Sequence, residues 1–395
     1  MAELYSLPDG WEWKKLGDIG KISTGKTPSK ANKEFYENGT IRFIKPPNLQ
    51  NSYNIQKAES DEFVTEDGAK KSTLLPKNTL MVCCIGSLGK FALSNEKVIT
   101  NQQINSIIFY DDIINYKYGY YYGFKLEKLL NDVANEAVVK IVNKTIFSNL
   151  DIPLPPLEEQ KRIVAKLDIL FAKIDKAIAL HQKNIDEADI FMASVLNDVF
   201  VELEEKYEKQ KLSEIVIFGG KNISTLEYPN LIYFSLEDIE AQTGKILNFK
   251  TVNESGVKGT AVRFDDNVVL YSKLRPYLNK VIVPNLEGCA TTELVVIKPK
   301  DKVDKYFLAS YLRSSNIVNF LNNDSMGAKM PRTNMKTFRN LDISFPPLPT
   351  QQKVVSYLDE ISNKMEKIKN LQKAKMQSLK ELKASILDKA FKGEL

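Results

Sequence analysis

The sequence has few of the residues that build metal sites and nucleophilic active sites: it contains three cysteines and one histidine. Cys83, Cys84 and Cys289 show no CxxC spacing, and His181 is far from all three. Because zinc sites gather Cys and His ligands at short spacings, we expect no metal site in this chain. The single histidine argues against a Ser-His-Asp arrangement. Sparse cysteines in odd number suit a reducing compartment.

Long apolar runs are also missing. No stretch approaches the roughly 20 apolar residues of a membrane-spanning helix. Residues Met1–Trp11 are polar and acidic and lack the apolar core of a signal peptide. We therefore expect a soluble, cytoplasmic protein.

The composition includes enough apolar residues to build several hydrophobic cores. The 395 residues are 43% hydrophobic and 27% charged, which predicts roughly two to four globular domains. The net charge of +5 and the pI of about 8.7 permit a nucleic-acid partner. Such a mild basic balance does not by itself require one.

The strongest internal signal is a repeat at a spacing of 191 residues. Residues 149–168 read NLDIPLPPLEEQKRIVAKLD, and residues 340–359 read NLDISFPPLPTQQKVVSYLD. Two copies at so long a period indicate tandem halves rather than a solenoid, which needs three or more units. Each copy contains a proline pair, and because proline disfavours helix at the residue before it, each pair predicts a boundary.

A long helical pattern follows each proline pair. Its apolar positions alternate at spacings of three and four, which is typical of a coiled-coil seam. We expect two helices of at least about 40 residues, each with the other as its antiparallel partner; two separate core helices are the alternative. His181 is interpreted as a polar seam residue that fixes register rather than as a metal ligand or general base. The predicted seams are Ile163, Leu167, Leu170, Ile174, Ala177, His181, Asn184, Ala188, Phe191 and Val195, and Val354, Leu358, Ile361, Met365, Ile368, Gln372, Lys375, Leu379, Leu382 and Ile386.

The remaining sequence, up to about residue 150 and over about 207–340, lacks this period. It has short apolar runs broken by Gly, Pro and Asn, which predict strands, and two helical stretches at 116–130 and 305–321. Each half is therefore expected to be a mixed α+β domain. The predicted strands are 41–44, 80–85 and 104–109 in the first half, and 231–234, 268–271, 281–283 and 294–297 in the second.

One segment imitates a nucleotide site. Gly20–Thr27 reads GKISTGKT, which matches the phosphate-binding pattern GxxxxGK[ST]. That site needs a buried strand before the loop and a helix after it, and neither pattern is present here. We therefore do not expect a nucleotide-binding site. The sequence also lacks an Asn/Asp-Pro-Pro-aromatic loop of adenine methylation and a nuclease-like carboxylate pattern.

Basic residues beside polar and aromatic ones recur in both halves, and such residues contact phosphates and base edges. A solvated surface is the better interpretation for any single lysine, but the set in each half favours DNA. The segments around Lys90 and Asn101 in the first half also align with those around Lys280 and Thr291 in the second. The candidate DNA-binding residues are Lys26, Thr27, Arg42, Lys45, Lys90, Asn101, Gln102 and Gln103, and Lys221, Lys273, Arg275, Tyr277, Lys280, Thr291, Thr292, Lys329 and Arg332.

Over nearly its whole length the chain resembles the specificity subunits of type I restriction-modification enzymes. The resemblance is carried by the two repeated junctions with their long helices, and by the closing AFKGEL at Ala390–Leu395. It is carried also by TGKTPSKANKEFYENGTI at Thr24–Ile41. This segment overlaps GKISTGKT and so accounts for the match to the phosphate-binding pattern. The second half has LYSKLRPYLNK at Leu270–Lys280 and CATTEL at Cys289–Leu294.

The resemblance implies two α+β target recognition domains, pseudo-twofold duplicated and joined by a pair of long antiparallel coiled-coil helices. Each domain would recognise one half of a bipartite double-stranded DNA site, and the helices would set the gap and dock two methyltransferase subunits. Those partners would bind S-adenosylmethionine, restriction (motor) subunits would cut DNA, and this chain would have no catalytic role. The implied segments are a first recognition domain at 1–152, a central spacer helix at 153–206, a second recognition domain at 207–345 and a C-terminal spacer helix at 346–395.

Two other functions remain as alternatives. The first is an enzyme, either a fused restriction-methylation protein or an NTPase, and the missing motifs speak against it. The second is a coiled-coil scaffold without a DNA role, which would shift no DNA duplex even with a partner present.

Overall fold

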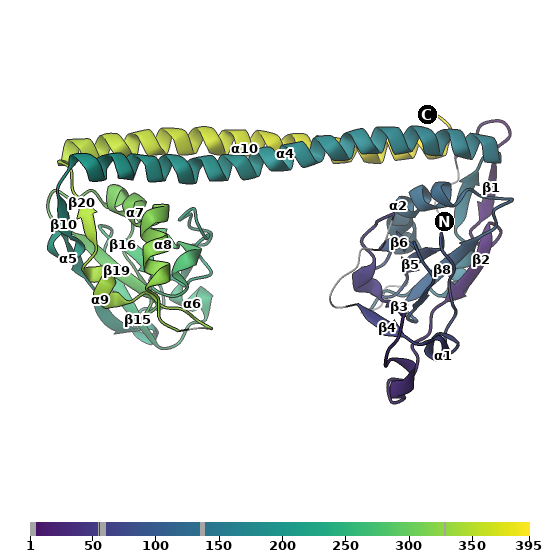
Figure 1. Ribbon diagram of the computed structural model, residues 1–395, viewed down its shortest axis with the longest axis horizontal. Helices are drawn as coiled ribbons and strands as arrows, with labels where there is room; N and C mark the ends of the chain where they lie inside the picture. The colour runs from purple at the N-terminus through teal and green to yellow at the C-terminus, as the bar shows by residue number, and fades with distance from the viewer. Residues whose placement is uncertain (1–4, 54, 56–60, 135–138, 328) are drawn as a thin grey trace. The chain divides into compact units, whose positions relative to one another are not determined.

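The structure, a computed structural model, describes residues 5–53, 55, 61–134, 139–327 and 329–395 (Figure 1). It divides into two compact units, the first made of Met1–Ala179 with Met376–Leu395 and the second of Leu180–Lys375. Each unit holds one globular domain and a part of both long helices. Within the described residues, no helix is long and apolar enough to cross a membrane.

The globular domain of the first unit is built on two sheets and a helix. A four-stranded antiparallel sheet has the order β2-β8-β5-β6, and a three-stranded sheet has the order β4-β3-β7, with β3 and β7 parallel. Strands β1 and β9 form a separate antiparallel pair. The bounds are β1 Glu12–Lys15, β2 Gly20–Thr24, η1 Lys33–Phe35, β3 Ile41–Ile44, η2 Pro46–Asn48, β4 Glu62–Val64, α1 Glu66–Ala69, β5 Leu80–Cys83, β6 Phe91–Leu93, β7 Val98–Thr100, β8 Ile104–Phe109, α2 Tyr116–Val133, α3 Lys144–Ser148 and β9 Asp151–Leu154.

The globular domain of the second unit repeats this plan. Its sheets have the orders β11-β19-β16-β17 and β12-β15-β18-β13-β14, with β13 and β18 parallel, and β10 pairs with β20. The bounds are β10 Lys209–Lys211, α5 Leu212–Ile215, β11 Val216–Phe218, β12 Lys221–Ser224, η3 Thr225–Glu227, β13 Ile232–Phe234, β14 Lys250–Thr251, α6 Val252–Ser255, β15 Thr260–Phe264, β16 Val269–Ser272, η4 Pro276–Leu278, β17 Val281–Ile282, β18 Gly288–Thr291, β19 Leu294–Pro299, α7 Lys305–Arg313, α8 Ser315–Asn323, α9 Met335–Arg339 and β20 Asp342–Ser344.

The two domains share strand order as well as sequence repeats. The sheet β2-β8-β5-β6 corresponds to β11-β19-β16-β17, and the parallel pair β3–β7 corresponds to β13–β18. The second domain adds β12 and β15 beyond β18, whereas the described residues of the first domain have an isolated bridge from Leu75 to Val98 at that edge. The mixed α+β class that we predicted is confirmed, and the duplication extends to the globular parts.

Two long helices follow the proline pairs, as predicted. Helix α4 spans Leu157–Lys206 (50 residues) and α10 spans Leu348–Lys392 (45 residues). In the first unit Asp175 pairs with Lys383 at 2.7 Å, and in the second unit Asp189 pairs with Lys369 at 2.9 Å. Higher residue numbers on α4 therefore meet lower numbers on α10, so the helices pack antiparallel.

The seam between these helices differs in part from the prediction. Asn184 and Phe191 are exposed, whereas Ile185 is buried and Met192 half-buried. On α10, Ile368, Lys375 and Leu382 are exposed, and Lys369, Met376 and Lys383 are half-buried in their place. Leu167, Leu170, Ile174, His181, Leu358, Ile361, Met365 and Gln372 are buried or half-buried, and the His181 ring bonds to the Gln372 amide.

Two lysines take part in the seam on α10. A lysine stem is apolar and can lie along a packed surface while its ammonium group reaches a partner. Lys383 does so, because its ammonium lies 4.4 Å from the centre of the Phe171 ring and also bonds to Asp175. A pattern that counts lysine as polar therefore leaves Lys369 and Lys383 out of the seam.

Two smaller predictions were also wrong. The helix expected over 305–321 is two helices, α7 and α8, because Ser314 adopts an extended ψ of 143° between them. The strand expected over 80–85 ends at Cys83, since the chain turns at Gly86, whose φ is +80°. Of the other predicted strands, 41–44 and 104–109 are present with the predicted bounds, and the rest are present with bounds that differ by one or two residues.

A buried glutamine joins the first turn of each long helix to its domain. The Gln160 side chain donates to Pro155 O and Ile113 O and accepts from Asn115 N–H, at 2.7–3.1 Å. Gln351 makes the equivalent bonds in the second unit, to Pro346 O, Lys302 O and Asp304 N–H, at 2.8–3.0 Å. Both glutamines are 0% exposed.

The last turns of the helices complete the same attachment. Phe391 of α10 packs in the first unit against Tyr118 and Tyr122 of α2, with ring centres 5.2 and 5.1 Å apart. Phe200 of α4 packs in the second unit against Phe307 and Tyr311 of α7, at 5.5 and 4.8 Å. Each domain is therefore held by the beginning of one long helix and the end of the other.

We predict that Gln351→Ala lowers the free energy of unfolding by about 2 to 4 kcal/mol, because it leaves an N–H group and two carbonyls buried without partners. The neighbouring Gln352→Ala is the control, since Gln352 is exposed and its loss should change stability by less than about 0.5 kcal/mol. Urea unfolding of the two variants measures the difference. Equal stabilities would contradict the anchoring role.

Candidate DNA interface

In the first domain the structure gathers five of the predicted residues at two adjoining loops. The loop after β2 carries Lys26 and Thr27, and the loop after β7 carries Asn101, Gln102 and Gln103. Thr27 Oγ1 donates to Gln102 Oε1 at 2.7 Å and so joins the loops. The exposed Lys26 and Gln102 thus lie beside the half-buried Thr27 and Gln103, and such cation, hydroxyl and amide groups can contact phosphates and base edges.

The backbone at this place leaves no room for a side chain at Gly25. A Cβ there would lie 2.2–2.3 Å from atoms of Thr100 and Asn101. Gly25 N–H donates to Ile104 O at 3.1 Å, which fastens the loop to β8. The first glycine of GKISTGKT begins strand β2, and no helix starts after Lys26 and Thr27. This geometry is not that of a phosphate-binding loop followed by a helix.

Asn101 has a positioning role. It is 6% exposed, and its side chain accepts from Gln103 N–H at 3.1 Å and donates to Gln103 Oε1 at 2.8 Å. Gln102 is exposed and Gln103 half-buried, so the asparagine orients the amide groups that remain accessible.

The other predicted residues of the first domain differ in how far their side chains are exposed for a contact with DNA. Lys90 is exposed beside β6, and its carbonyl accepts from Cys83 N–H at 2.8 Å. Lys45 is half-buried and ion-paired with Glu62. Arg42 requires a correction: it is 1% exposed, and its guanidinium is ion-paired with Asp61 at 2.7 Å. The Arg42 guanidinium is thus engaged inside the domain and is not exposed for a contact with DNA.

In the second domain the predicted residues surround Glu293. Lys273 N–H donates to Glu293 O at 3.1 Å, and the Glu293 carboxylate accepts from the Arg332 guanidinium at 3.0 Å. Thr291 and Thr292 precede Glu293 in the chain. Arg275 N–H donates to Pro331 O at 2.7 Å and brings the turn after β16 against the same segment.

The remaining predicted residues of this domain differ in their exposure and in their hydrogen bonds. Tyr277 is 45% exposed and Lys329 is exposed. The Lys280 ammonium donates to Leu236 O at 2.6 Å and is half-buried, which indicates a structural bond. Lys221 stands apart on β12, in a hollow of about 320 Å³ that Arg263 and Glu287 also line.

Three residues at these places were missed by sequence reasoning. Ser72 accepts from Lys26 N–H at 3.0 Å, and Asn105 accepts from Thr24 Oγ1 at 2.6 Å. Glu293 was left out although it aligns with Gln103, so the internal alignment already contained a signal for it. Ser72 and Asn105 carry no such signal, because only the fold brings them to the loop.

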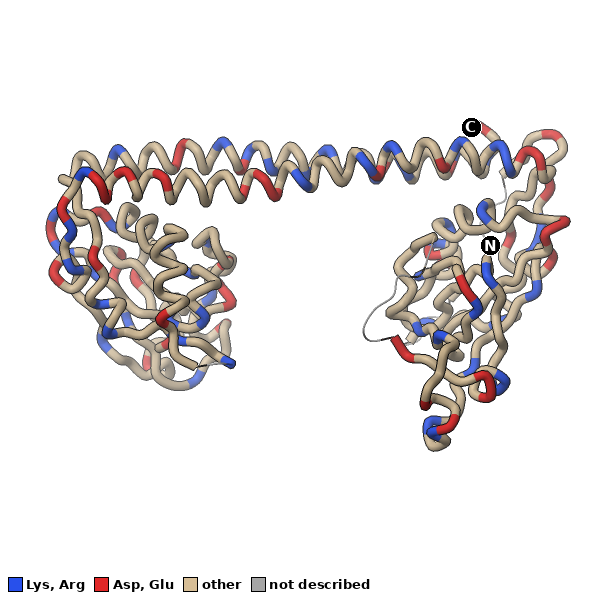
Figure 2. Tube along the Cα trace, viewed as in Figure 1, with Lys and Arg blue, Asp and Glu red and all other residues tan. Residues whose placement is uncertain are grey.

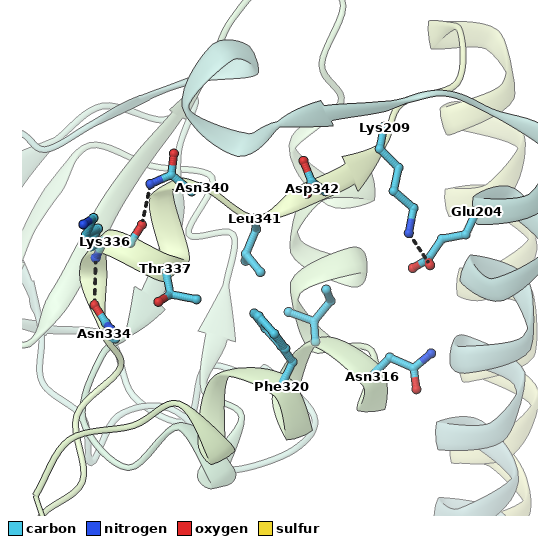
Figure 3. A pocket seen from close by; sticks show the side chains of 11 residues that line it. Glu204, Lys209, Asn316, Phe320, Asn334, Lys336, Thr337, Asn340, Leu341 and Asp342 are labelled. Atoms are coloured by element: carbon cyan, nitrogen blue, oxygen red, sulfur yellow. Dashed lines mark hydrogen bonds and ion pairs between the residues drawn. The ribbon is translucent and has the colours of Figure 1, made fainter.

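A pocket in the second unit lies elsewhere and contains none of the predicted DNA residues. It measures about 710 Å³, and Figure 3 shows it between α8, α9, β20 and the end of α4. Ile317 is buried, Phe320 is 51% exposed, and Lys209 is ion-paired with Glu204 at 2.9 Å. Its lining is Glu204, Lys209, Asn316, Ile317, Phe320, Asn334, Lys336, Thr337, Asn340, Leu341 and Asp342.

Charge and thiol chemistry give no sign of a metal or nucleophilic centre in the described part of the chain. No group of three or more His, Cys, Asp or Glu residues there is placed to hold a metal ion. Burial raises the pKa of the Cys84 thiol to about 12 and that of Cys289 to about 11, so both are protonated at neutral pH. Acidic and basic residues are interspersed along the helices and over both domains (Figure 2).

Known proteins were compared with the chain on sequence and on fold. It is 23% identical over 98% of its length to the specificity subunit of the type I restriction enzyme EcoDI of Escherichia coli, covering 89% of that protein. It is 26% identical over 100% of its length to the MjaIX specificity subunit of Methanocaldococcus jannaschii, covering 95%.

Solved structures show the same fold. A chain from a structural study of complex assembly and conformational transition of the type I R-M system matches with a TM-score of 0.74 at 21% identity, covering 99% of this chain and 100% of that one. The HsdS subunit from Thermoanaerobacter tengcongensis matches with a TM-score of 0.55 at 22% identity, covering 99% of each chain.

The family described as "Type I restriction modification DNA specificity domain" matches residues 8–188 and again residues 204–376. These two matches follow the sequence repeat and together include most of the chain. The chain therefore belongs to the family of type I restriction-modification specificity subunits, and it carries the family's domain twice.

Proposed function

We propose that this chain selects the DNA site of a type I restriction-modification complex by binding an asymmetric bipartite sequence, and that it has no catalytic role. The observation that carries this proposal is the pair of matching domain frameworks with different side chains at the same loops. The segment Asn101–Gln103 of the first domain corresponds to Thr291–Glu293 of the second. Cys84 N–H bonds to Gln103 O as Lys273 N–H bonds to Glu293 O.

The two domains share a framework but differ in their loop side chains. This suits DNA, because the sugar-phosphate backbone is the same at both half-sites while the bases differ. Phosphates position a protein on the duplex, and base-edge contacts give the sequence preference. In this proposal 1–152 and 207–345 are the recognition domains, and 153–206 and 346–395 are the spacer helices that set the gap between half-sites. Two methyltransferase subunits would bind S-adenosylmethionine and methylate adenine, and restriction subunits would join through them.

An exposed apolar row on the helix pair supports docking of a partner. In the second unit Leu180 and Phe191 of α4 are 53% and 48% exposed, and Ile368 and Leu371 of α10 are 40% and 54% exposed. Leu180 and Leu371 immediately precede the bonded pair His181 and Gln372. Helices whose second apolar row faces water typically pack against further helices, and we assign this row to the methyltransferase.

We predict that Phe191→Ser with Leu371→Ser weakens methyltransferase binding tenfold or more without lowering the unfolding midpoint, because both side chains are already exposed. Leu226→Ser is the matched control: Leu226 is 72% exposed on the second globular domain, and its loss should leave binding intact. Titration calorimetry with the co-expressed methyltransferase measures the affinities. Unchanged binding by the double variant would refute this docking surface.

The DNA role is tested by co-expressing the chain with a methyltransferase subunit and selecting bound duplexes from a random library. We expect two short sequence blocks separated by a fixed unspecified gap. Exchanging residues 1–150 for the first domain of another specificity subunit should change one block and leave the other block and the gap as they were. A single block, or a change in both blocks, would contradict the proposal of two recognition domains. No selected sequence from an assembled complex would favour a scaffold.

A further inference from the structure

The turn after β5 in the first domain and the turn after β16 in the second are held by equivalent backbone hydrogen bonds. In the first domain Gly86 N–H donates to Lys140 O at 3.0 Å. In the second domain Arg275 N–H donates to Pro331 O at 2.7 Å. Arg275 therefore occupies the place of a glycine in the other copy.

The backbone conformation at this place favours glycine. Gly86 has a φ of +80° and Arg275 a φ of +51°, which the structure assigns to the left-handed region. Glycine adopts that region without a steric penalty, whereas other residues do so uncommonly, and Asn and Asp more readily than the rest. Residues in this conformation are enriched at functional sites, and Arg275 combines it with a side chain that is free to reach a ligand.

The Arg275 side chain is exposed, and among the described residues no hydrogen bond, ion pair or ring contact engages its guanidinium. Every other arginine of the chain has such a contact. The neighbouring Arg332 is held by Glu293 at 3.0 Å, so its charge is balanced inside the domain. The engaged arginines are Arg42 with Asp61, Arg162 with Glu159, Arg263 with Glu287, Arg313 with Thr243 O, Arg332 with Glu293, and Arg339 over the Phe218 ring.

The difference between Gly86 and Arg275 favours a base contact over a phosphate contact for Arg275. Both domains would meet the same sugar-phosphate backbone, so a phosphate-binding residue would suit both turns alike. Here one copy has glycine and the other has arginine. A guanidinium makes two parallel hydrogen bonds to guanine O6 and N7, which requires a well-positioned side chain, and the fixed turn supplies that position.

We propose that Arg275 contacts a guanine in the half-site of the second domain, an inference that rests on the specificity function proposed above. The first domain has no equivalent group. Its one arginine within residues 1–152 is the buried Arg42. Its exposed loop instead carries the amides of Gln102 and Gln103, which pair well with adenine.

The test uses the full chain co-expressed with a methyltransferase subunit, and it compares wild type with Arg275→Gly and Lys302→Gly by selection from a random duplex library. Lys302 is the matched control, because it is also exposed, basic and at positive φ (+69°) in the same unit. Wild type should prefer guanine at one position of the second block by roughly 5- to 150-fold. Arg275→Gly should reduce that preference to near 1 and leave the first block unchanged, with a melting temperature no lower than that of wild type. Lys302→Gly should retain both blocks.

A third variant, Arg275→Lys, keeps the charge but cannot form the two parallel bonds, and it decides the question if Arg275→Gly fails to fold. It should lose the guanine preference while keeping most of the non-specific affinity. A retained guanine preference in either variant, or a loss of affinity that is uniform across all sequences, would overturn the inference and indicate at most a phosphate contact. A wild-type complex that selects no two-block sequence would instead refute the proposed function itself.

Discussion

Two glutamine side chains, each without solvent exposure, determine where the long helices of this protein leave their domains. A buried amide that lacked partners would strongly destabilise the fold, and Gln160 and Gln351 each find three backbone partners. One partner of each glutamine is the first proline of the pair before the helix, and the other two lie just before α2 or α7 in the same domain. The direction in which each helix starts is therefore fixed by the domain behind it rather than by helix propensity.

The same arrangement explains why the duplication has persisted in some places and not in others. The glutamine and the phenylalanine that hold each domain recur at the repeat spacing, as do the antiparallel partners His181 and Gln372. Loops such as Asn101–Gln103 and Thr291–Glu293 keep their backbone bonds and differ in every side chain. Backbone hydrogen bonds hold such loops without regard to side-chain type, so the contact surface can vary while the fold stays the same.

Much of this could be predicted from the sequence, because the relevant signals are local or repeated. The helices, most strands and the antiparallel pairing follow from period and repetition. The seam lies one residue away from the predicted positions at Asn184 and Phe191, because the apolar pattern of α4 contains two adjacent rows and Ile185 and Met192 belong to the buried one. Arg42 was assigned to the surface because its partner Asp61 is distant in sequence. The left-handed turn at Arg275 depends on Pro331, a tertiary contact that no local pattern reveals.

The discontinuous first unit has a consequence for the order in which the protein takes shape. Its core includes Leu387, Ala390 and Phe391 together with residues of the first half. The second unit, Leu180–Lys375, is one continuous segment. During synthesis at about 5 to 20 residues per second, the second unit can close soon after its last residue emerges. Between the synthesis of Ala179 and that of Met376, the first unit must wait on the order of ten seconds or more at this rate, with the aromatic face of α2 uncovered. A temporary binding partner for Tyr118 and Tyr122 would be most useful to the nascent chain during that interval.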